Sequence, residues 1–156
     1  MTLVRGIWTA LIALAMALSA GLSVAQERGT AAEAKAMAEK AIAHVASAGK
    51  EKAFADFTAK GSGWHNKDLY VFALDMEGVT LGHGGNPALV GKNIGALKDP
   101  TGKAFVVEFS SLAKSKGSGW VDYQFLDPQS KKTLPKSSYI IKFPDGSGYL
   151  GVGIYK

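Results

Sequence analysis

Apolar residues recur at helical spacing in the stretch that follows the first 29 residues. Thr30 and Glu33 have the spacing of a capping box, in which the two side chains satisfy free backbone N–H groups at a helix start. Apolar positions then repeat every three or four residues, at Met37, Ala41, Ile42 and Val45. The pattern predicts a helix that ends near Gly49, followed by a second helix over residues 50–60.

Short apolar runs rich in aromatic and β-branched residues predict five strands in the rest of the chain. They cover residues 69–74, 79–83, 120–125, 136–143 and 149–155, with turn residues between them. A helical pattern between the second and third strands starts at Thr101 or Gly102 and ends at Lys116. Residues 91–100 are expected to be a loop with one helical turn. Because short turns join most strands, we expect an antiparallel sheet with helices on its faces.

The first 25 residues have the organisation of an export signal. Arg5 precedes an apolar run over residues 7–18, and Ser23-Val24-Ala25 resembles a cleavage site. An uncleaved membrane anchor is the alternative, because this apolar stretch approaches the ~20 residues that span a bilayer. We expect residues 1–25 to be a signal peptide and residues 26–156 to form one domain. The protein would then be periplasmic or secreted, or membrane-anchored if the signal is retained.

Composition narrows the function classes. The chain contains no cysteine, which excludes disulfides, thiol catalysis and cysteine-ligated zinc or haem. Its net charge of +5 comes from scattered lysines that fit a solvated surface. Export and the lack of a recognition motif argue against a nucleic-acid partner. The three histidines form no metal-binding pattern, so we expect neither a metal nor another cofactor.

Residues 146–151, GSGYLG, match the letters of a dinucleotide-binding fingerprint. That fingerprint needs its glycines between a strand and a helix, where a phosphate meets the helix N-terminus. Here the glycines open a predicted strand, so we interpret the match as accidental. The sequence also lacks a nucleophile elbow and a close histidine–carboxylate pair, and we expect no enzymatic activity.

Several short motifs follow one another in a recognisable order. They are Leu74-Asp75, Gly78, His83, Asn86-Pro87, LVGKN at 89–93, the segment 99–103, GWVDY at 119–123, KSSY at 136–139 and GVGIY at 151–155. In this order they resemble the single Cache domain, a PAS-like extracytoplasmic sensor of bacterial chemoreceptors and histidine kinases. The likeness covers essentially all of residues 26–156.

The resemblance implies an α+β fold with a five-stranded antiparallel sheet. A long N-terminal helix would pack on one face, a helical segment would lie between strands 2 and 3, and a small-ligand pocket would lie on the other face. The resemblance also implies binding of a small organic acid or similar metabolite, with the signal passed to a membrane receptor. The sequence shows no second membrane helix or transmitter, so we expect a partner such as a receptor, kinase or transporter subunit.

A pocket for a small organic anion needs apolar walls and a few fixed hydrogen-bond donors. Tyr123, Lys136, Tyr139 and His83 offer such donors, and Trp120 could form a wall. The alternative for the aromatic residues is core packing, while Lys136 could be an exposed strand end and His83 a structural histidine. Strand alternation alone does not bring all of them to one face.

Gly151 and Gly153 leave one side of the last strand without side chains. Such a bare surface permits close approach of either a helix or a ligand to the backbone. We expect a helix to pack there.

Two hypotheses therefore follow for the function. The first is an exported sensor-type domain that binds a small organic anion without covalent chemistry. The alternative is a structural or protein-interaction module with a Cache-like fold and no ligand. A cavity lined by the candidate residues would favour the first, and a filled interior would favour the second.

Overall fold

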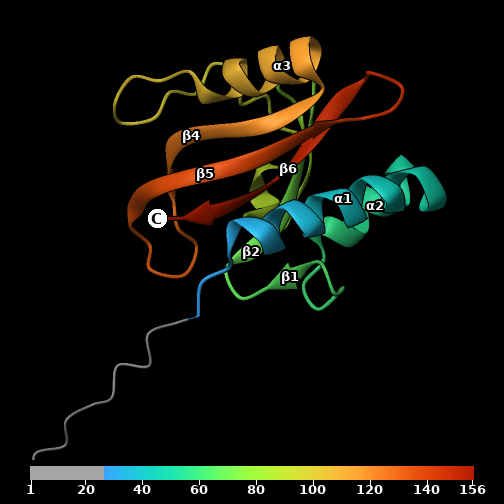
Figure 1. Cartoon of the computed structure of the whole chain (residues 1–156), viewed down its shortest axis with the longest axis horizontal. Helices are drawn as coiled ribbons and strands as arrows, with labels where there is room; N and C mark the ends of the chain where they lie inside the picture. The colour runs from blue at the N-terminus through green and yellow to red at the C-terminus, as the bar shows by residue number, and fades with distance from the viewer. Residues whose placement is uncertain (1–26) are drawn as a thin grey trace, which may run out of the picture.

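A computed structural model describes residues 27–156 as one antiparallel sheet between two helical layers (Figure 1). Helices α1 (Ala31–Ala48) and α2 (Lys50–Thr58) cover one face of the sheet, and α3 (Phe105–Lys116) covers the other. The expected signal peptide lies outside the described residues. Within residues 27–156, no helix is both long enough and apolar enough to cross a membrane.

The start of α1 agrees with the capping box in the sequence. The Thr30 side chain accepts a hydrogen bond from the Glu33 backbone N–H, and the Glu33 side chain accepts one from the Thr30 backbone N–H. One side of the helix is buried against the sheet and consists of small residues, namely Ala34, Ala38, Ala41 and Val45. Small side chains let this helix lie close to the sheet surface.

Helix α3 begins at Phe105, a few residues later than the sequence pattern predicts. The Asp99 carboxylate explains the delay because it holds the preceding segment in a turn. It accepts hydrogen bonds from the backbone N–H groups of Thr101, Lys103 and Gln124. The bonds to Thr101 and Lys103 stabilise a local turn that competes with helical geometry, and the bond to Gln124 ties this turn to β4.

Five strands form the main sheet in the order β3–β2–β6–β5–β4, and every pairing is antiparallel. Their bounds are β2 (Leu69–Asp75), β3 (Thr80–His83), β4 (Ser118–Leu126), β5 (Thr133–Lys142) and β6 (Gly148–Tyr155). This confirms the predicted fold class and the placement of the long N-terminal helix on one face.

Two small elements differ from the sequence prediction. A two-residue strand, β1 (His65–Asn66), pairs with the start of β2 and is too short to give a period-two pattern. The expected helical turn lies at η1 (Pro87–Leu89), earlier than the predicted residues 91–100. The Asn86 side chain caps this turn by accepting a hydrogen bond from the Ala88 N–H.

Alternation along the strands divides the interior into two apolar clusters. In β2, Leu69, Val71 and Ala73 join the cluster beneath α1 and α2. Tyr70 and Phe72 join the cluster beneath α3, which is rich in aromatic side chains. The cluster on the α3 side also contains Tyr123, Tyr149 and Tyr155.

Gly151 and Gly153 face the α3 side of the sheet, opposite Leu150 and Val152. A Cβ atom on Gly151 would collide with the ring of Phe72, and one on Gly153 would collide with the side chains of Lys136 and Ser138. The expectation that a helix packs against these glycines is therefore wrong. Neighbouring strand side chains occupy the space instead.

Candidate ligand-binding site

A small cavity lies on the α3 side of the sheet. Its volume is about 10 Å³, which is room for about one water molecule. It is lined by Tyr70, Phe72, Leu74, His83, Ile94, Phe105, Phe109, Tyr123, Phe125 and Lys136. A surface hollow of about 240 Å³ shares Tyr70, His83 and Phe125 with it. These three side chains thus line both the inner cavity and its outer neighbour.

Strand β5 directs Lys136 into this cavity, where the residue is 1% exposed. Within residues 27–156 its ammonium has one hydrogen-bond partner, the Tyr70 hydroxyl, at 2.6 Å. Aromatic rings surround the charge, with Nζ 4.2 Å from the Tyr70 ring centroid and 4.6 Å from that of Tyr155. Burial lowers the pKa of Lys136 to about 7. Because an ammonium has three N–H donors, two remain for another group.

The hydroxyl groups next to Lys136 form an oriented chain. Tyr155 donates to the Leu126 carbonyl at 2.9 Å, so it accepts from Tyr70 at 3.2 Å. Tyr70 therefore donates to Tyr155 and accepts from Lys136. Burial raises the pKa of both tyrosines and keeps them protonated. This chain fixes the position of the ammonium.

His83 ends β3 and is 4% exposed. Its Nδ1 atom accepts a hydrogen bond from the Asn86 backbone N–H at 2.9 Å, so the neutral ring carries its proton on Nε2. Burial, together with the charge of Lys136, lowers the pKa of His83 to about 3. The imidazole is consequently a neutral donor at physiological pH.

Tyr123 enters the cavity from β4. Its ring stacks on Phe105 with centroids 4.8 Å apart, and its hydroxyl shares a hydrogen bond of 3.0 Å with Ser138. Burial raises the pKa of Tyr123 and keeps the phenol neutral. It therefore lines the cavity as a polar but uncharged group.

The structure brings together His83, Tyr123 and Lys136 but places Trp120 and Tyr139 on the opposite face of the sheet. Trp120 is 38% exposed, and its ring lies 5.2 Å from that of Tyr139. Tyr139 packs against the cluster beneath α1. Trp120 is an odd number of residues from Tyr123 on β4, and Tyr139 is an odd number from Lys136 on β5. Because side chains alternate between the two faces of a sheet, Trp120 and Tyr139 point away from the cavity.

Sequence reasoning missed Tyr70 and Tyr155, which hold the lysine. Tyr70 belongs to a strand buried on both faces, where a continuous apolar run hides the alternation. Tyr155 lies two residues beyond Gly153 on the same side of β6 and could have been found from that spacing. Its pairing with Tyr70, 85 positions away in sequence, has no local signal.

The site combines one buried cation, neutral donors and aromatic walls. This composition suits a small anion with an apolar part. In the described part of the chain, no three His, Asp or Glu side chains gather as metal ligands.

Comparison with known proteins relates this architecture to bacterial sensors. The chain matches the family model for single Cache domain 2 over residues 11–156. It is 30% identical over 91 residues to the methyl-accepting chemotaxis protein McpP of Pseudomonas putida. The matched part is 58% of this chain but spans only 17% of that receptor's length.

Solved structures show the same fold. A methyl-accepting chemotaxis protein from Vibrio parahaemolyticus superposes with a TM-score of 0.68 and 26% identity, covering 80% of this chain and 86% of the other. A Cache chemosensory domain solved to explain carboxylic acid recognition gives 0.63 and 28% identity, covering 78% and 84%. From the family match and these superpositions together, the chain belongs to the single Cache domain family.

Proposed function

We propose that this chain is an exported sensor-type domain that binds a small organic acid at Lys136. It would act in periplasmic sensing or signal transduction through a partner, such as a membrane receptor, a kinase or a transporter subunit. The observation that carries the proposal is the buried ammonium of Lys136, which has donors to spare and aromatic walls around it.

Electrostatics supports an anion as the ligand. A buried charge without a contacting counter-ion is costly, and no carboxylate in residues 27–156 is within hydrogen-bonding or ion-pair distance of Lys136. A carboxylate would supply the missing charge and accept the two free N–H groups. Charge-assisted hydrogen bonds of this kind are stronger than neutral ones.

The cavity must widen to admit such a ligand. A volume of about 10 Å³ is too small for two carboxylate oxygens and a carbon chain. Phe125 and Tyr70 border the outer hollow, so we expect their side chains to move when the acid enters. Side-chain rearrangement of this size is common at binding sites.

The same small volume favours the second candidate function, a structural or protein-interaction module without a ligand. In that case the tyrosines and Lys136 would form a polar core that specifies the fold. The two functions differ in a simple observable, which is stabilisation by a soluble acid.

Thermal unfolding with a panel of short carboxylates and amino acids, including formate, acetate, propionate, lactate and succinate, tests the proposal. We expect at least one acid to raise Tm, and Lys136→Met to abolish the shift. Lys142→Met serves as the control because it removes a lysine from the same strand outside the cavity. If no acid in the panel stabilises the protein, the interaction module becomes the better account.

Export is tested separately. We expect the protein isolated from the periplasm or medium to begin at Gln26, as N-terminal sequencing would show. Recovery of the intact N-terminus in the membrane fraction would favour the retained anchor.

A further inference from the structure

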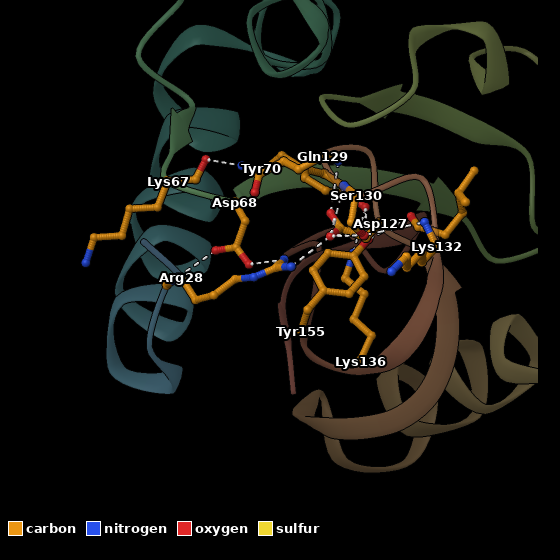
Figure 2. Close-up of polar contacts among 12 residues, drawn as sticks. Arg28, Lys67, Asp68, Tyr70, Asp127, Gln129, Ser130, Lys132, Lys136 and Tyr155 are labelled. Carbon is orange, nitrogen blue, oxygen red and sulfur yellow. Dashed lines mark hydrogen bonds and ion pairs between the residues drawn. The ribbon is translucent and has the colours of Figure 1, made fainter. Parts of the chain in front are cut away.

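Arg28 lies just before α1 and joins two buried carboxylates. Nη1 donates to Asp68 Oδ2 at 3.0 Å, and Nη2 donates to Asp127 Oδ2 at 2.8 Å (Figure 2). Asp68 comes from the turn before β2 and is 5% exposed, while Asp127 comes from the β4–β5 loop and is fully buried. We call Arg28, Asp68 and Asp127 the Arg28 clamp.

Both carboxylates of the clamp accept hydrogen bonds on each of their oxygens. Asp68 accepts from Arg28 on one oxygen and from the Gly29 backbone N–H on the other, at 2.6 Å. Asp127 also accepts from the Ser130 hydroxyl at 2.7 Å, and its bonds to Arg28 and Ser130 outweigh burial and lower its pKa to about 2. One guanidinium therefore faces two negative charges, and the clamp carries a net charge of −1.

The clamp and the cavity share Tyr155. The Arg28 guanidinium carbon lies 5.5 Å from the centroid of this ring, and Lys136 Nζ lies 4.6 Å from it. Figure 2 shows Tyr155 and Lys136 beside the clamp. Burial lowers the pKa of Lys136, and the negative charges of Asp68 and Asp127 oppose this effect without cancelling it. When Lys136 is protonated, its charge and the net charge of the clamp sum to zero.

The other groups around Lys136 are neutral at pH 7. Titratable side chains reach it from β2, β3, β4 and β6, namely Tyr70, His83, Tyr123 and Tyr155. Burial raises the pKa of the three tyrosines and lowers that of His83. Helix α3 contributes the apolar Phe105 and Phe109 to the cavity. Within residues 27–156, the clamp therefore supplies the charges that act on Lys136.

We propose that the charge of the Arg28 clamp sets both the proton affinity of Lys136 and, through its field at the cavity, the affinity of the site for an anion. Its effect on an anion rests on the proposed function, whereas its effect on Lys136 does not. The two carboxylates favour the ammonium, and Arg28 limits their field. An incoming anion competes with the clamp for Lys136, so the net −1 charge weakens anion binding. Binding energies are reciprocal, and an anion at Lys136 strengthens the hold of Arg28 on the carboxylates.

The first test measures Lys136 in protein without added anion. Selective ¹³Cε labelling of lysine gives its titration midpoint by NMR, with Lys136→Met for assignment. Arg28→Gln should raise the midpoint by about one pH unit, because Lys136 becomes the remaining counter-ion, and Asp127→Asn should lower it by about as much. Asp68→Asn is a second variant that removes a carboxylate from the clamp. It is needed because Asp127 also holds the β4–β5 loop, so Asp127→Asn could disturb that loop.

Opposite shifts distinguish charge control from loosening of the fold, since loosening would hydrate Lys136 and raise its midpoint in every variant. Lys67→Gln is the matched control, because Lys67 pairs with Glu27 and Glu33 near the clamp but outside it. Midpoints that stay unchanged, or that rise in the arginine and aspartate variants alike, would overturn the proposal.

The second test uses acetate at pH 6 and calorimetric titration. Arg28→Gln should weaken acetate binding about tenfold, and Asp127→Asn or Asp68→Asn should strengthen it, because at this pH the field of the clamp dominates. If all variants bind acetate with the same affinity as the wild-type protein, the clamp does not control anion affinity. If wild-type protein binds neither acetate nor any acid of the thermal-unfolding panel while the Lys136 midpoints still move in opposite directions, the proposed ligand fails and the effect of the clamp on Lys136 stands. If acetate binds but the Lys136 midpoints stay fixed in all variants, the proposed function stands and the control of Lys136 by the clamp fails.

Discussion

Lys136 is 1% exposed, and its ammonium lies among the rings of Tyr70, Phe72, Phe125 and Tyr155. The rings attract the cation, but they replace only part of the hydration that it loses on burial. The single bond to Tyr70 and the charges of Asp68 and Asp127 offset a further part, but burial still lowers the pKa of Lys136 to about 7. Burial of Lys136 therefore lowers the stability of the fold, and in the function proposed above the same ammonium would give the site its specificity for an anion.

The first prediction concerns stability above neutral pH. The pKa of Lys136 is about 7 in the folded protein against an ordinary 10.5, so between these values the unfolded chain binds a proton that the folded protein does not. The contribution of Lys136 to stability should therefore rise with pH from about 7 to about 10.5 and be lowest below 7, where the penalty is complete. Lys136→Met should remove this rise and add a few kcal/mol at pH 6. Urea unfolding from pH 6 to 9 measures both effects, and an equal slope in the variant would contradict them.

The second prediction concerns mild acid and His83. Its folded pKa of about 3 against an ordinary 6.5 means that the unfolded chain gains a proton first as pH falls. Stability should fall by up to about 1.4 kcal/mol per pH unit below pH 6.5, before carboxylates titrate. His83→Asn keeps an acceptor for the Asn86 N–H and should abolish the fall between pH 6.5 and 5. Denaturant titrations with His65→Asn as control would show it; persistence of the slope in the His83 variant would assign it elsewhere.

At the scale of elements, β6 makes the burial of Lys136 possible. Gly153 leaves room for the lysine side chain, and Gly151 leaves room for the Phe72 ring. The strand is central in the sheet, between β2 and β5, so it cannot shift to create space. The positions of the two glycines thus determine which side chains from the neighbouring strands, Phe72 and Lys136, can pack against the backbone of β6.

The third prediction compares these two glycines. Gly153→Ala and Gly151→Ala should each destabilise the protein by about 1–3 kcal/mol, since each added methyl group overpacks a buried face. Only Gly153→Ala should also displace Lys136 and move its titration midpoint. Chemical unfolding and ¹³Cε NMR of the two variants provide the comparison. Equal effects on the Lys136 midpoint would mean that Gly153 has no special relation to the lysine.

At the scale of the whole molecule, two apolar clusters share one sheet. The α1 side contains Trp64, and the α3 side contains Tyr70, Tyr123, Tyr149 and Tyr155. Strands β2 and β6 contribute to both clusters, so neither can lose its packing while the other keeps an intact sheet. The sheet should therefore couple the two layers.

The fourth prediction is a single cooperative transition. Trp64 fluorescence, with the other two tryptophans replaced by Phe, reports on the α1 side, while tyrosine near-UV circular dichroism reports mainly on the α3 side. The two urea transitions should coincide, as in other small single domains. An α3-side signal that changes at lower urea would instead show that the α3 side unfolds on its own.

Much of the fold could be predicted from local patterns. The capping box at Thr30 located α1, and turn residues separated the five long strands with small errors at their ends. The start of α3 could not be predicted, because Asp99 bonds to the Gln124 amide, which belongs to a distant strand. β1 was missed for a different reason, since two residues carry no periodicity.

The candidate site could be predicted only in part. Lys136, Tyr123 and His83 were chosen for their chemistry, and the structure brings them to one cavity. Trp120 and Tyr139 were chosen in the same way but lie across the sheet. Chemistry identifies possible donors, whereas the face that each donor reaches depends on how its strand is packed.

The sequence by itself determined the elements and the alternation of their faces, because helical and strand periods follow from backbone geometry over a few residues. Only the tertiary structure decided which faces meet. It brings Arg28 to Asp127 across 99 positions and Lys136 to Tyr70 across 66. It also decided that Lys136 is desolvated, since an aromatic enclosure exists only once β2, β4, β5 and β6 have paired and α3 has covered them.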